Sequence, residues 1–385
     1  MEFSLTEDQK MMQETARRFA QEAIRPTMEE DEKNHHFNQD ILRQMAELGL
    51  FGCVIPAEYG GLGLDDGMVT SMLITEEIAR VSPSWGLPFN MQTQGPARSI
   101  LRWGTEDQRQ TYIPRLVNAE WIGAFAITEP NSGSDVASMK TTAVEDGDDY
   151  ILNGSKTWIS NAHVADVALV YAMTEPALKH RGMTCFLVHL KETEGVTSVP
   201  IESKLGLHCA PTGELYFENA RVPKSQILGG PNNGFKVCMT MLDNTRLSCA
   251  CRAVGVGRAC LEEAADYAKS REQFGKPIAD YQLIRGDIAE MVVHHEAARL
   301  LVLKAAWEKD QDPNVRNSQS VSIAKYYASE TANEAAHMAM KIFGSFGFST
   351  EYPAERLLRD ARSFLVVEGT SNIQKVIISG NYLAQ

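Results

Sequence analysis

The sequence predicts an α+β protein of several domains, in which helices come first, a β-domain follows and helices close the chain. Its 385 residues exceed what one hydrophobic core ordinarily holds. Apolar residues recur with a helical period before about residue 122 and after about residue 233, and with the period of strands between them. We therefore predict a helical N-terminal domain (1–122), a middle antiparallel β-barrel domain (123–232) and a C-terminal helical bundle domain (233–385).

The N-terminal domain is predicted to be helical because helix-start signals precede apolar periodic segments. Thr6 followed by Gln9 has the pattern of a capping box, and Asn38 and Thr105 are further capping residues. Residues 69–81 keep a helical pattern that stops before a proline.

The middle domain is predicted to be a small antiparallel barrel. Residues 150–161 are interpreted as a strand, an Asn153-Gly154 hairpin turn and a second strand. Further short strands at 164–173, 183–190 and 213–219, separated by Gly, Asn and Pro, are typical of such barrels.

The C-terminal domain is predicted to be a bundle because long periodic segments are joined by short connections. These segments are 235–246, 247–270, 281–309 and 318–344.

Composition excludes several kinds of protein. A formal net charge of −13 argues against a nucleic-acid partner. No apolar run approaches the roughly 20 residues that span a bilayer, so no membrane partner is expected. The seven cysteines form no C-x-x-C pair, and no metal site is expected. Scattered thiols and an N-terminus without a signal-peptide pattern indicate a cytoplasmic protein.

Glu368 is a lone carboxylate after a run of apolar residues, and a glycine follows it directly. Apolar surroundings raise the pKa of a carboxylate, and a raised pKa suits a general base near neutral pH. The alternative is structural: a helix ends at Glu368-Gly369 and a new one starts with Thr370 as its N-cap.

Residues 128–135 form the densest polar loop of the chain. Its small residues expose backbone N–H groups, and Thr128, Ser132 and Ser134 carry hydroxyls. Such a loop can bind a pyrophosphate or the edge of a heteroaromatic ring. An ordinary surface turn is the alternative.

Trp158 and Ser160 are expected on one face of the same strand. A flat indole beside a hydroxyl can pack against an isoalloxazine ring. Packing of Trp158 in a core is the alternative.

Asp243 and Arg246 are neighbours on a helix face, which allows both to recognise a polar ligand. A surface ion pair of little energetic value is the alternative.

Two loops follow long helices. Arg271 lies where a helix ends, and an arginine there can bind a phosphate, including one in a neighbouring subunit. A favourable interaction with the helix dipole is the alternative. The glycine-broken loop at 344–353 can approach a dinucleotide, but no strand precedes it, so a Rossmann site is not expected.

Taken in this order, these motifs resemble those of the acyl-CoA dehydrogenase family over essentially the whole chain. Six motifs in register carry the resemblance: Ile127-Thr128-Glu129-Pro130 with Gly133-Ser134-Asp135; 153–161; Asp243 with Arg246; Arg271 with Gln273-Phe274-Gly275-Lys276; 350–360; and Glu368-Gly369-Thr370. The resemblance implies a helical N-terminal domain, a middle β-domain and a C-terminal four-helix bundle, assembled as a homotetramer.

The resemblance also implies roles for matching residues. Glu368 is expected to be the catalytic base. FAD is expected to contact Phe125, Ile127, Thr128, Ser134, Trp158 and Ser160. The FAD of an adjacent subunit is expected to contact Arg271, Gln273, Phe274, Gln282, Lys341, Gly344, Ser345, Thr370 and Asn372. The acyl-CoA substrate is expected to contact Ser134, Asp243, Thr245, Arg246 and Gly369.

The reaction implied by the resemblance is α,β-dehydrogenation of an acyl-CoA thioester. Glu368 removes the α-proton, flavin N5 takes the β-hydride, and an electron-transfer flavoprotein accepts the electrons. Thr245 stands where isovaleryl and long-chain types carry an alternative base, which favours Glu368. Lys341, Ser345 and the pair Asn131-Ser132 depart from the usual family residues.

The chain looks most similar to the glutaryl-CoA branch and its relatives that act on cyclic acyl-CoAs. Glutaryl enzymes carry an arginine for the distal carboxylate in the segment that matches 82–91, and this segment has no cation here. We therefore expect an apolar acyl group, short, branched or cyclic, lined by Trp85, Leu87, Phe89 and Met91.

Two alternatives to the dehydrogenase remain open on sequence alone. The same fold can serve an enoyl-CoA reductase or an acyl-CoA oxidase. A flavin-free relative that acts as a scaffold is the non-enzyme alternative.

Overall fold

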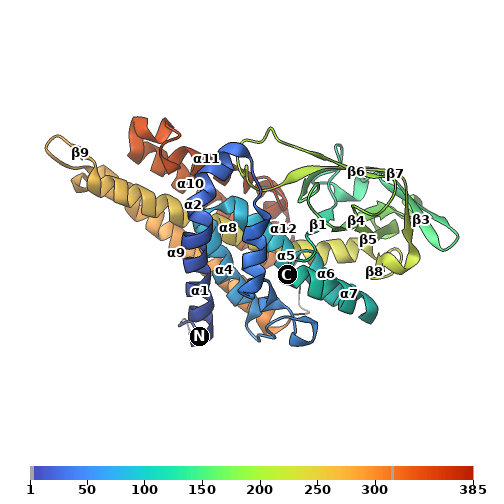
Figure 1. The fold of residues 1–385 in the computed structure, drawn as a ribbon. Helices are drawn as coiled ribbons and strands as arrows, with labels where there is room; N and C mark the ends of the chain where they lie inside the picture. The colour runs from blue at the N-terminus through green and yellow to red at the C-terminus, as the bar shows by residue number, and fades with distance from the viewer. Residues whose placement is uncertain (1–3, 314–315, 385) are drawn as a thin grey trace.

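The computed structural model describes residues 4–313 and 316–384; the predicted domain ends at residues 1 and 385 lie outside them. Helices open the chain, a β-sheet follows, and long helices close it (Figure 1). The α+β class with three successive regions is therefore confirmed.

The N-terminal region is helical. Both predicted capping boxes are present: the side chain of Thr6 accepts from Gln9 N, and that of Thr105 accepts from Gln108 N. Asn38 caps a helix as predicted. The helices are α1 (Glu7–Phe19), α2 (Arg25–Asn34), α3 (Gln39–Glu47), α4 (Gly67–Val81), α5 (Pro83–Gln94), α6 (Pro96–Trp103) and α7 (Glu106–Val117), with a π-helical turn at Ala20–Ile24.

The middle region holds one sheet of eight described strands, in the order β6-β7-β3-β2-β4-β5-β8, with β1 beside β4. The strands are β1 (Gly123–Ala126), β2 (Thr142–Asp146), β3 (Asp149–Ser160), β4 (Val167–Met173), β5 (Met183–His189), β6 (Val196–Pro200), β7 (Thr212–Pro223) and β8 (Ile227–Leu228).

The expected closed antiparallel barrel is corrected in two respects. Among the described strands, β6 and β8 end an open path, and β1 runs parallel to β4. The parallel pairing is possible because the long excursion through β2 and β3 separates the two strands in sequence. Every residue of β4 is buried, which is typical of a strand covered on both faces.

The predicted hairpin turn at Asn153-Gly154 is also wrong. β3 continues through these residues, and its register against β7 shifts between Leu152 and Gly154. A Cβ at Gly154 would lie 2.6 Å from Oγ1 of Thr141. The glycine therefore permits a bulge and a close approach of the neighbouring chain, instead of a turn.

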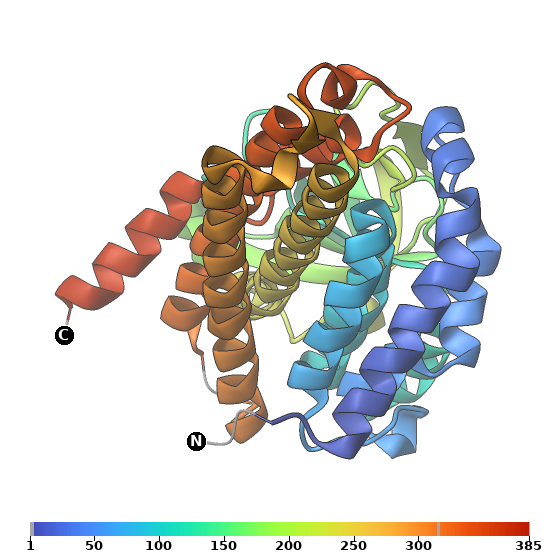
Figure 2. The ribbon, with the colours of Figure 1, turned by 90° about the vertical axis from the view of Figure 1, so that its left-hand side faces the viewer.

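The C-terminal region consists of long helices, and the two predicted segments before residue 270 form one 37-residue helix. These helices are α8 (Gly234–Ser270), α9 (Gln282–Gln311), α10 (Ser318–Phe343), α11 (Pro353–Ser363) and α12 (Ser371–Leu383), with a small hairpin of β9 (Glu272–Gln273) and β10 (Lys276–Pro277) after α8. α12 extends away from the other helices (Figure 2).

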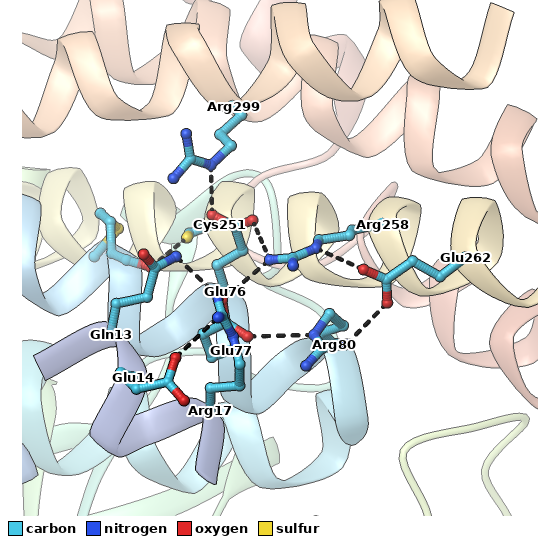
Figure 3. Close-up of polar contacts among 11 residues, drawn as sticks. Gln13, Glu14, Arg17, Glu76, Glu77, Arg80, Cys251, Arg258, Glu262 and Arg299 are labelled. Atoms are coloured by element: carbon cyan, nitrogen blue, oxygen red, sulfur yellow. Dashed lines mark hydrogen bonds and ion pairs between the residues drawn. The ribbon is translucent and has the colours of Figure 1, made fainter. Parts of the chain in front are cut away.

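A network of buried charges fixes α4 against α1, α8 and α9 (Figure 3). Glu77, fully buried on α4, lies 2.9 Å from Arg17 and 3.0 Å from Arg258. The adjacent Glu76 lies 3.1 Å from Arg258 and 2.8 Å from Arg299. Because each carboxylate has more than one cation, the desolvation of these charges is compensated and the four helices keep a fixed arrangement.

Within the described residues, no helix is long and apolar enough to cross a membrane. Nor does that part of the chain bring three or more His, Cys, Asp or Glu side chains together as metal ligands.

Candidate active site

Glu368 lies in a turn between α11 and α12. Its φ is +57° and that of Gly369 is +88°, so two consecutive residues are left-handed. The helix before it ends at Ser363, and Thr370 caps α12 by accepting from Ile373 N. The structural alternative is therefore right about the cap and wrong about where the helix ends. A left-handed non-glycine residue is strained and persists only where its surroundings hold it.

Two side chains hold the carbonyl of Glu368. Arg246 Nε donates to it at 2.9 Å, and Gln374 Nε2 donates at 3.2 Å. Gln374 also donates to the carbonyl of Gly369 at 2.8 Å. The strained turn is thus tied to both α8 and α12.

Lys325, a fully buried residue of α10, holds the two ends of the same turn. Its Nζ donates to the carbonyl of Phe364 at 2.7 Å and to that of Gly369 at 2.8 Å. The carbonyl of Phe364 is buried and that of Gly369 is partly buried, so both need donors, and this lysine supplies them.

The carboxylate of Glu368 accepts a hydrogen bond from Thr245 Oγ1 at Oε2, at 2.8 Å. Burial raises the pKa of Glu368. The Thr245 hydrogen bond opposes this shift, as do the positive charges of Arg246, Arg252 and Lys325. The outcome is a carboxyl group with a raised pKa, as expected of a general base.

Asp243 is only 2% exposed, so the alternative of a surface ion pair is wrong. Its Oδ2 accepts from Arg316 Nε at 3.1 Å and from Ser318 Oγ at 2.9 Å, whereas Arg246 is 3.5 Å from Oδ1. Asp243 therefore fixes the start of α10 beside α8.

A cavity of about 300 Å³ opens next to Asp243 and Asn244. Four cations line it, contributed by α6, α9 and the α9–α10 connection: Arg98, Arg102, Lys309 and Arg316. Burial lowers the pKa of Lys309 to about 8. This concentration of positive charge suits a polyanionic ligand.

The polar loop at 128–135 is anchored and is not a simple surface turn. Glu129 Oε1 accepts from Nζ of the fully buried Lys156 at 2.8 Å. The same carboxylate accepts from Lys140 N at 2.6 Å and Thr141 N at 3.0 Å. The loop beyond this anchor keeps Gly133 and Ser134 exposed.

Trp158 is 59% exposed, so packing in a core is excluded for its indole. Its φ is +59°, at a register shift of β3 against β7. Thr157 N donates to the carbonyl of Thr128 at 2.9 Å, which puts the polar loop beside this indole. Ser160 is partly buried two residues further along the strand.

The remaining flavin residues of this region lie on or next to β1. Phe125 is half-buried, and Ile127 is buried with its carbonyl accepting from Lys156 Nζ at 3.2 Å. The first predicted group of flavin residues is thus brought together, apart from the exposed Ser134 in the adjoining loop.

The second predicted group lies elsewhere in the chain. Arg271, Gln273 and Phe274 belong to the β9 hairpin, which Figure 1 places at the opposite end of the molecule from the β-domain. The other members of this group that lie near helix ends of the bundle are Gln282, Lys341, Gly344 and Ser345. One chain therefore does not bring the two groups together. Thr370 and Asn372 lie instead at the start of α12, next to Glu368.

Of the residues predicted to line the acyl group, some are buried in the protein core and one is partly exposed. Trp85 stacks on Phe37 with ring centroids 5.0 Å apart, and Phe89 lies 5.7 Å from Phe51. Both side chains are fully buried in the N-terminal core. Leu87 is partly exposed.

Sequence reasoning missed Lys325, Gln374, Lys156 and Arg252 as site residues. Lys325 and Arg252 did leave a signal, since each is a lone charge in a helical run of small apolar residues. Gln374 left none, because a glutamine near a helix start is ordinary.

Three family models match the chain in succession: "Acyl-CoA dehydrogenase, N-terminal domain" at residues 6–120, "Acyl-CoA dehydrogenase, middle domain" at 124–220 and "Acyl-CoA dehydrogenase, C-terminal domain" at 232–383. They cover most of the sequence.

Two curated relatives and one solved structure are similar over nearly full length. Glutaryl-CoA dehydrogenase of Desulfococcus multivorans is 46% identical over 98% of this chain and 97% of its own. The Caffeyl-CoA reductase-Etf complex subunit CarC of Acetobacterium woodii is 41% identical over 98% of this chain and 99% of its own. A glutaryl-coenzyme A dehydrogenase glutaryl-CoA complex superposes with a TM-score of 0.98 at 45% identity, covering 100% of this chain and 97% of the other.

Proposed function

The chain belongs to the acyl-CoA dehydrogenase family of FAD-dependent oxidoreductases, and on this premise we propose that Glu368 removes the α-proton of an acyl-CoA thioester while the β-hydride is lost to the flavin. The electrons pass to an electron-transfer flavoprotein. The protein works in the cytoplasm, in keeping with seven buried free thiols. Its domains are 1–122, 123–232 and 233–385.

The environment of Glu368 carries this proposal. Burial raises the pKa of its carboxyl group, and Thr245 orients the carboxylate through Oε2. In the described part of the chain, the N–H of Glu368 donates no hydrogen bond, whereas its carbonyl accepts two. This N–H is available to the thioester carbonyl, where negative charge develops as the α-proton leaves.

The residues near β3 fit a flavin. A large indole that is both exposed and in a strained backbone conformation is unusual, and a flat ring packed on Trp158 accounts for it. Thr128 and Ser160 flank that indole with hydroxyls, and Phe125 adds a half-buried ring nearby. When bound there, FAD supplies the acceptor for a hydride.

The second group of flavin residues supports a homo-oligomer, which we propose is a homotetramer. Because the β9 hairpin is remote from β3, the strand of Trp158, within one chain, Arg271, Gln273 and Phe274 serve the flavin of a neighbouring subunit (Figure 1). Phe274 is 95% exposed at the tip of this hairpin. Large apolar side chains are also exposed along α9 and α12: Leu283, Val293, Leu300, Trp307, Val376, Tyr382 and Leu383.

The basic cavity beside Asp243 and Asn244 is assigned to the phosphates of CoA. Lys309 is buried, and the structure gives its ammonium no hydrogen bond or ion pair within the described residues. Phosphate groups would supply the missing anion. Arg246 contacts Asp243 at the edge of this cavity and also donates to the carbonyl of Glu368, so these two residues connect the cavity to the turn that carries Glu368.

The acyl group is proposed to have an apolar skeleton, short, branched or cyclic. Of the predicted lining residues, Trp85, Phe89 and Met91 are buried on α5, and α5 packs against α8, which supports an apolar skeleton. Enoyl-CoA reduction is the second candidate, favoured by the similarity to the Caffeyl-CoA reductase-Etf complex subunit CarC.

The test is the visible spectrum of the purified protein under anaerobic conditions while acyl-CoAs are added. We expect bleaching of the oxidised flavin band in the wild type. Glu368→Gln should retain the flavin and lose turnover by at least roughly 10²–10⁴-fold, because general-base catalysis is removed. Near-wild-type bleaching by this variant would contradict the assignment, and steady-state turnover that is faster from enoyl-CoA to acyl-CoA than in the opposite direction would favour the reductase.

A further inference from the structure

Arg252 is a buried arginine that forms no hydrogen bond or ion pair with residues 4–313 and 316–384. It is only 2% exposed, and its Nε has no hydrogen-bond acceptor among these residues. Among the described residues, no carboxylate lies within ion-pair distance of its guanidinium, whose nearest recorded contact is the ring of Phe364 at 5.8 Å. Burying a cation in this way is costly unless an anion is supplied. A ligand that brings its own negative charge would account for it.

Arg252 lies on the face of α8 that meets Glu368. Thr245, Cys249 and Arg252 follow at i, i+4 and i+7, so all three share one helix face. Thr245 contacts the carboxylate of Glu368, and Arg252 stands two turns further, about 10 Å along the axis. Phe364, beneath the guanidinium, begins the turn that carries Glu368. The cation therefore lies on the same face of α8 as the residue that contacts the base, two helical turns away from it.

Gly86 of α5 makes room for this arginine. A Cβ at position 86 would lie 3.0 Å from Cδ and 3.1 Å from Cγ of Arg252. The segment 82–91 has no cation of its own, which is why the sequence argues against a carboxylate on the substrate. The tertiary structure changes this conclusion, since α8 delivers a guanidinium against that segment.

We propose that Arg252 binds a carboxylate at the distal end of the acyl group, so that the substrate is the CoA thioester of a short dicarboxylic acid. The proposal rests on the proposed function and refines it, because the skeleton between the thioester and the carboxylate remains apolar. A guanidinium can hold a carboxylate through two parallel hydrogen bonds. Phe364 lies under the guanidinium and Gly86 lies beside the aliphatic part of the side chain, so both limit where the arginine can go.

A competing explanation is that the positive charge of Arg252 only lowers the pKa of Glu368 and does not contact the substrate. Substrates that differ in the distal group separate the two explanations. Loss of a purely electrostatic effect on the base changes turnover of every acyl-CoA by a similar factor, whereas loss of a carboxylate contact changes one class of substrate.

The experiment compares glutaryl-CoA with hexanoyl-CoA, which has a neutral end, in the wild type, Arg252→Met and Arg252→Lys. The readout is the ratio of kcat/KM for the two substrates, followed by anaerobic flavin reduction. In the wild type, glutaryl-CoA should be preferred. In R252M this ratio should fall by roughly 10²–10⁴-fold, as for other sites built to pair a polar group. The ratio for R252K should lie between those of the wild type and R252M, because lysine keeps the positive charge without the planar geometry of the guanidinium.

Equilibrium binding gives a second readout that does not need turnover. In a Glu368→Gln background, the Kd for glutaryl-CoA should rise at least roughly 10²-fold on adding R252M. If R252M does not fold, Gly86→Ala is the alternative, since its Cβ displaces the Arg252 side chain and should lower the same ratio.

The outcomes are distinguishable. Preference for hexanoyl-CoA in the wild type, or an equal loss on both substrates in R252M, overturns the proposal and leaves the dehydrogenase function standing. Failure of every acyl-CoA to reduce the bound flavin, while glutaryl-CoA still binds in an Arg252-dependent way, overturns the dehydrogenase function and retains the carboxylate site.

Discussion

The hydroxyl of Thr245 donates to Oε2 of Glu368 at 2.8 Å, although the two residues are 123 positions apart in sequence. α8 and the turn before α12 therefore meet at the carboxylate that we propose as the base. A threonine at position 245 can donate a hydrogen bond to this carboxylate but cannot itself act as a carboxylate base.

Thr245→Val should move the pH dependence of the reaction. The hydroxyl lowers the pKa of Glu368 against the effect of burial, so its removal raises that pKa further. The base works when deprotonated, and the acidic limb of kcat/KM should therefore shift to higher pH, with activity recovering at alkaline pH. Thr245→Ser keeps the hydroxyl and should match the wild type. An unchanged limb in T245V would show that the hydrogen bond does not act on the base.

Lys325→Met should loosen the turn that carries Glu368. The buried carbonyl of Phe364 loses its donor, and an unsatisfied buried group costs roughly 1–3 kcal/mol, whereas the carbonyl of Gly369 keeps the hydrogen bond from Gln374. We expect the free energy of unfolding in denaturant to fall by about 2 kcal/mol or more, together with kcat. Lys304→Met, at an exposed position of α9, is the matched control and should change stability by less than about 0.5 kcal/mol. Equal effects of the two variants would deny Lys325 its positioning role.

Lys156→Met should destabilise the loop at 128–135. It leaves the buried Glu129 without its cation, which typically costs about 3–5 kcal/mol. The double variant Glu129→Gln/Lys156→Met should be less destabilised than K156M alone. A double-mutant cycle by denaturant unfolding measures this coupling. Additive effects would mean that the pair is not energetically coupled.

Glu129 should also contribute to acid denaturation. Burial raises its pKa, but the charge and hydrogen bond of Lys156 outweigh this and hold the pKa below 4.5. A lowered folded pKa stabilises the protein above the unfolded value, and this contribution is lost as pH falls through the folded pKa. The stability difference between wild type and Glu129→Gln should therefore shrink below about pH 4.5, as followed by thermal unfolding. A constant difference across that range would contradict the assignment.

Arg271→Met and Glu368→Gln should complement each other in mixed oligomers. If Arg271 serves the flavin of a neighbouring subunit, a hybrid contains one site with both Glu368 and Arg271. Co-expression of the two inactive variants should give activity above the sum of the parts. The control is co-expression of Glu368→Gln with the double variant Glu368→Gln/Arg271→Met, because no site in that mixture contains Glu368. Hybrid oligomers can be verified by placing different tags on the two variants. If these hybrids are inactive, Arg271 and Glu368 serve a site within the same subunit.

The sequence by itself determined the order of the regions and many element boundaries. Capping residues such as Thr6 and Thr105 act on backbone groups three residues away, so a local pattern is sufficient to predict them. It also singled out Glu368 as a candidate base, because a lone carboxylate after an apolar run is visible without knowing the fold. Asn153-Gly154 shows the limit of such local signals, since contact with Thr141 turned an expected hairpin into a bulge.

Only the tertiary structure decided what surrounds that carboxylate. Lys325, Thr245 and Arg252 come from two helices, and their distances to the Glu368 turn are set by helix packing and not by sequence spacing. A lone charge in an apolar helical run predicts burial on that face, but it does not name the partner. The space beside Gly86 that the Arg252 side chain occupies likewise results from the packing of α5 against α8. The substrate prediction considered only the cations of segment 82–91, and the sequence could not show that α8 places Arg252 beside that segment.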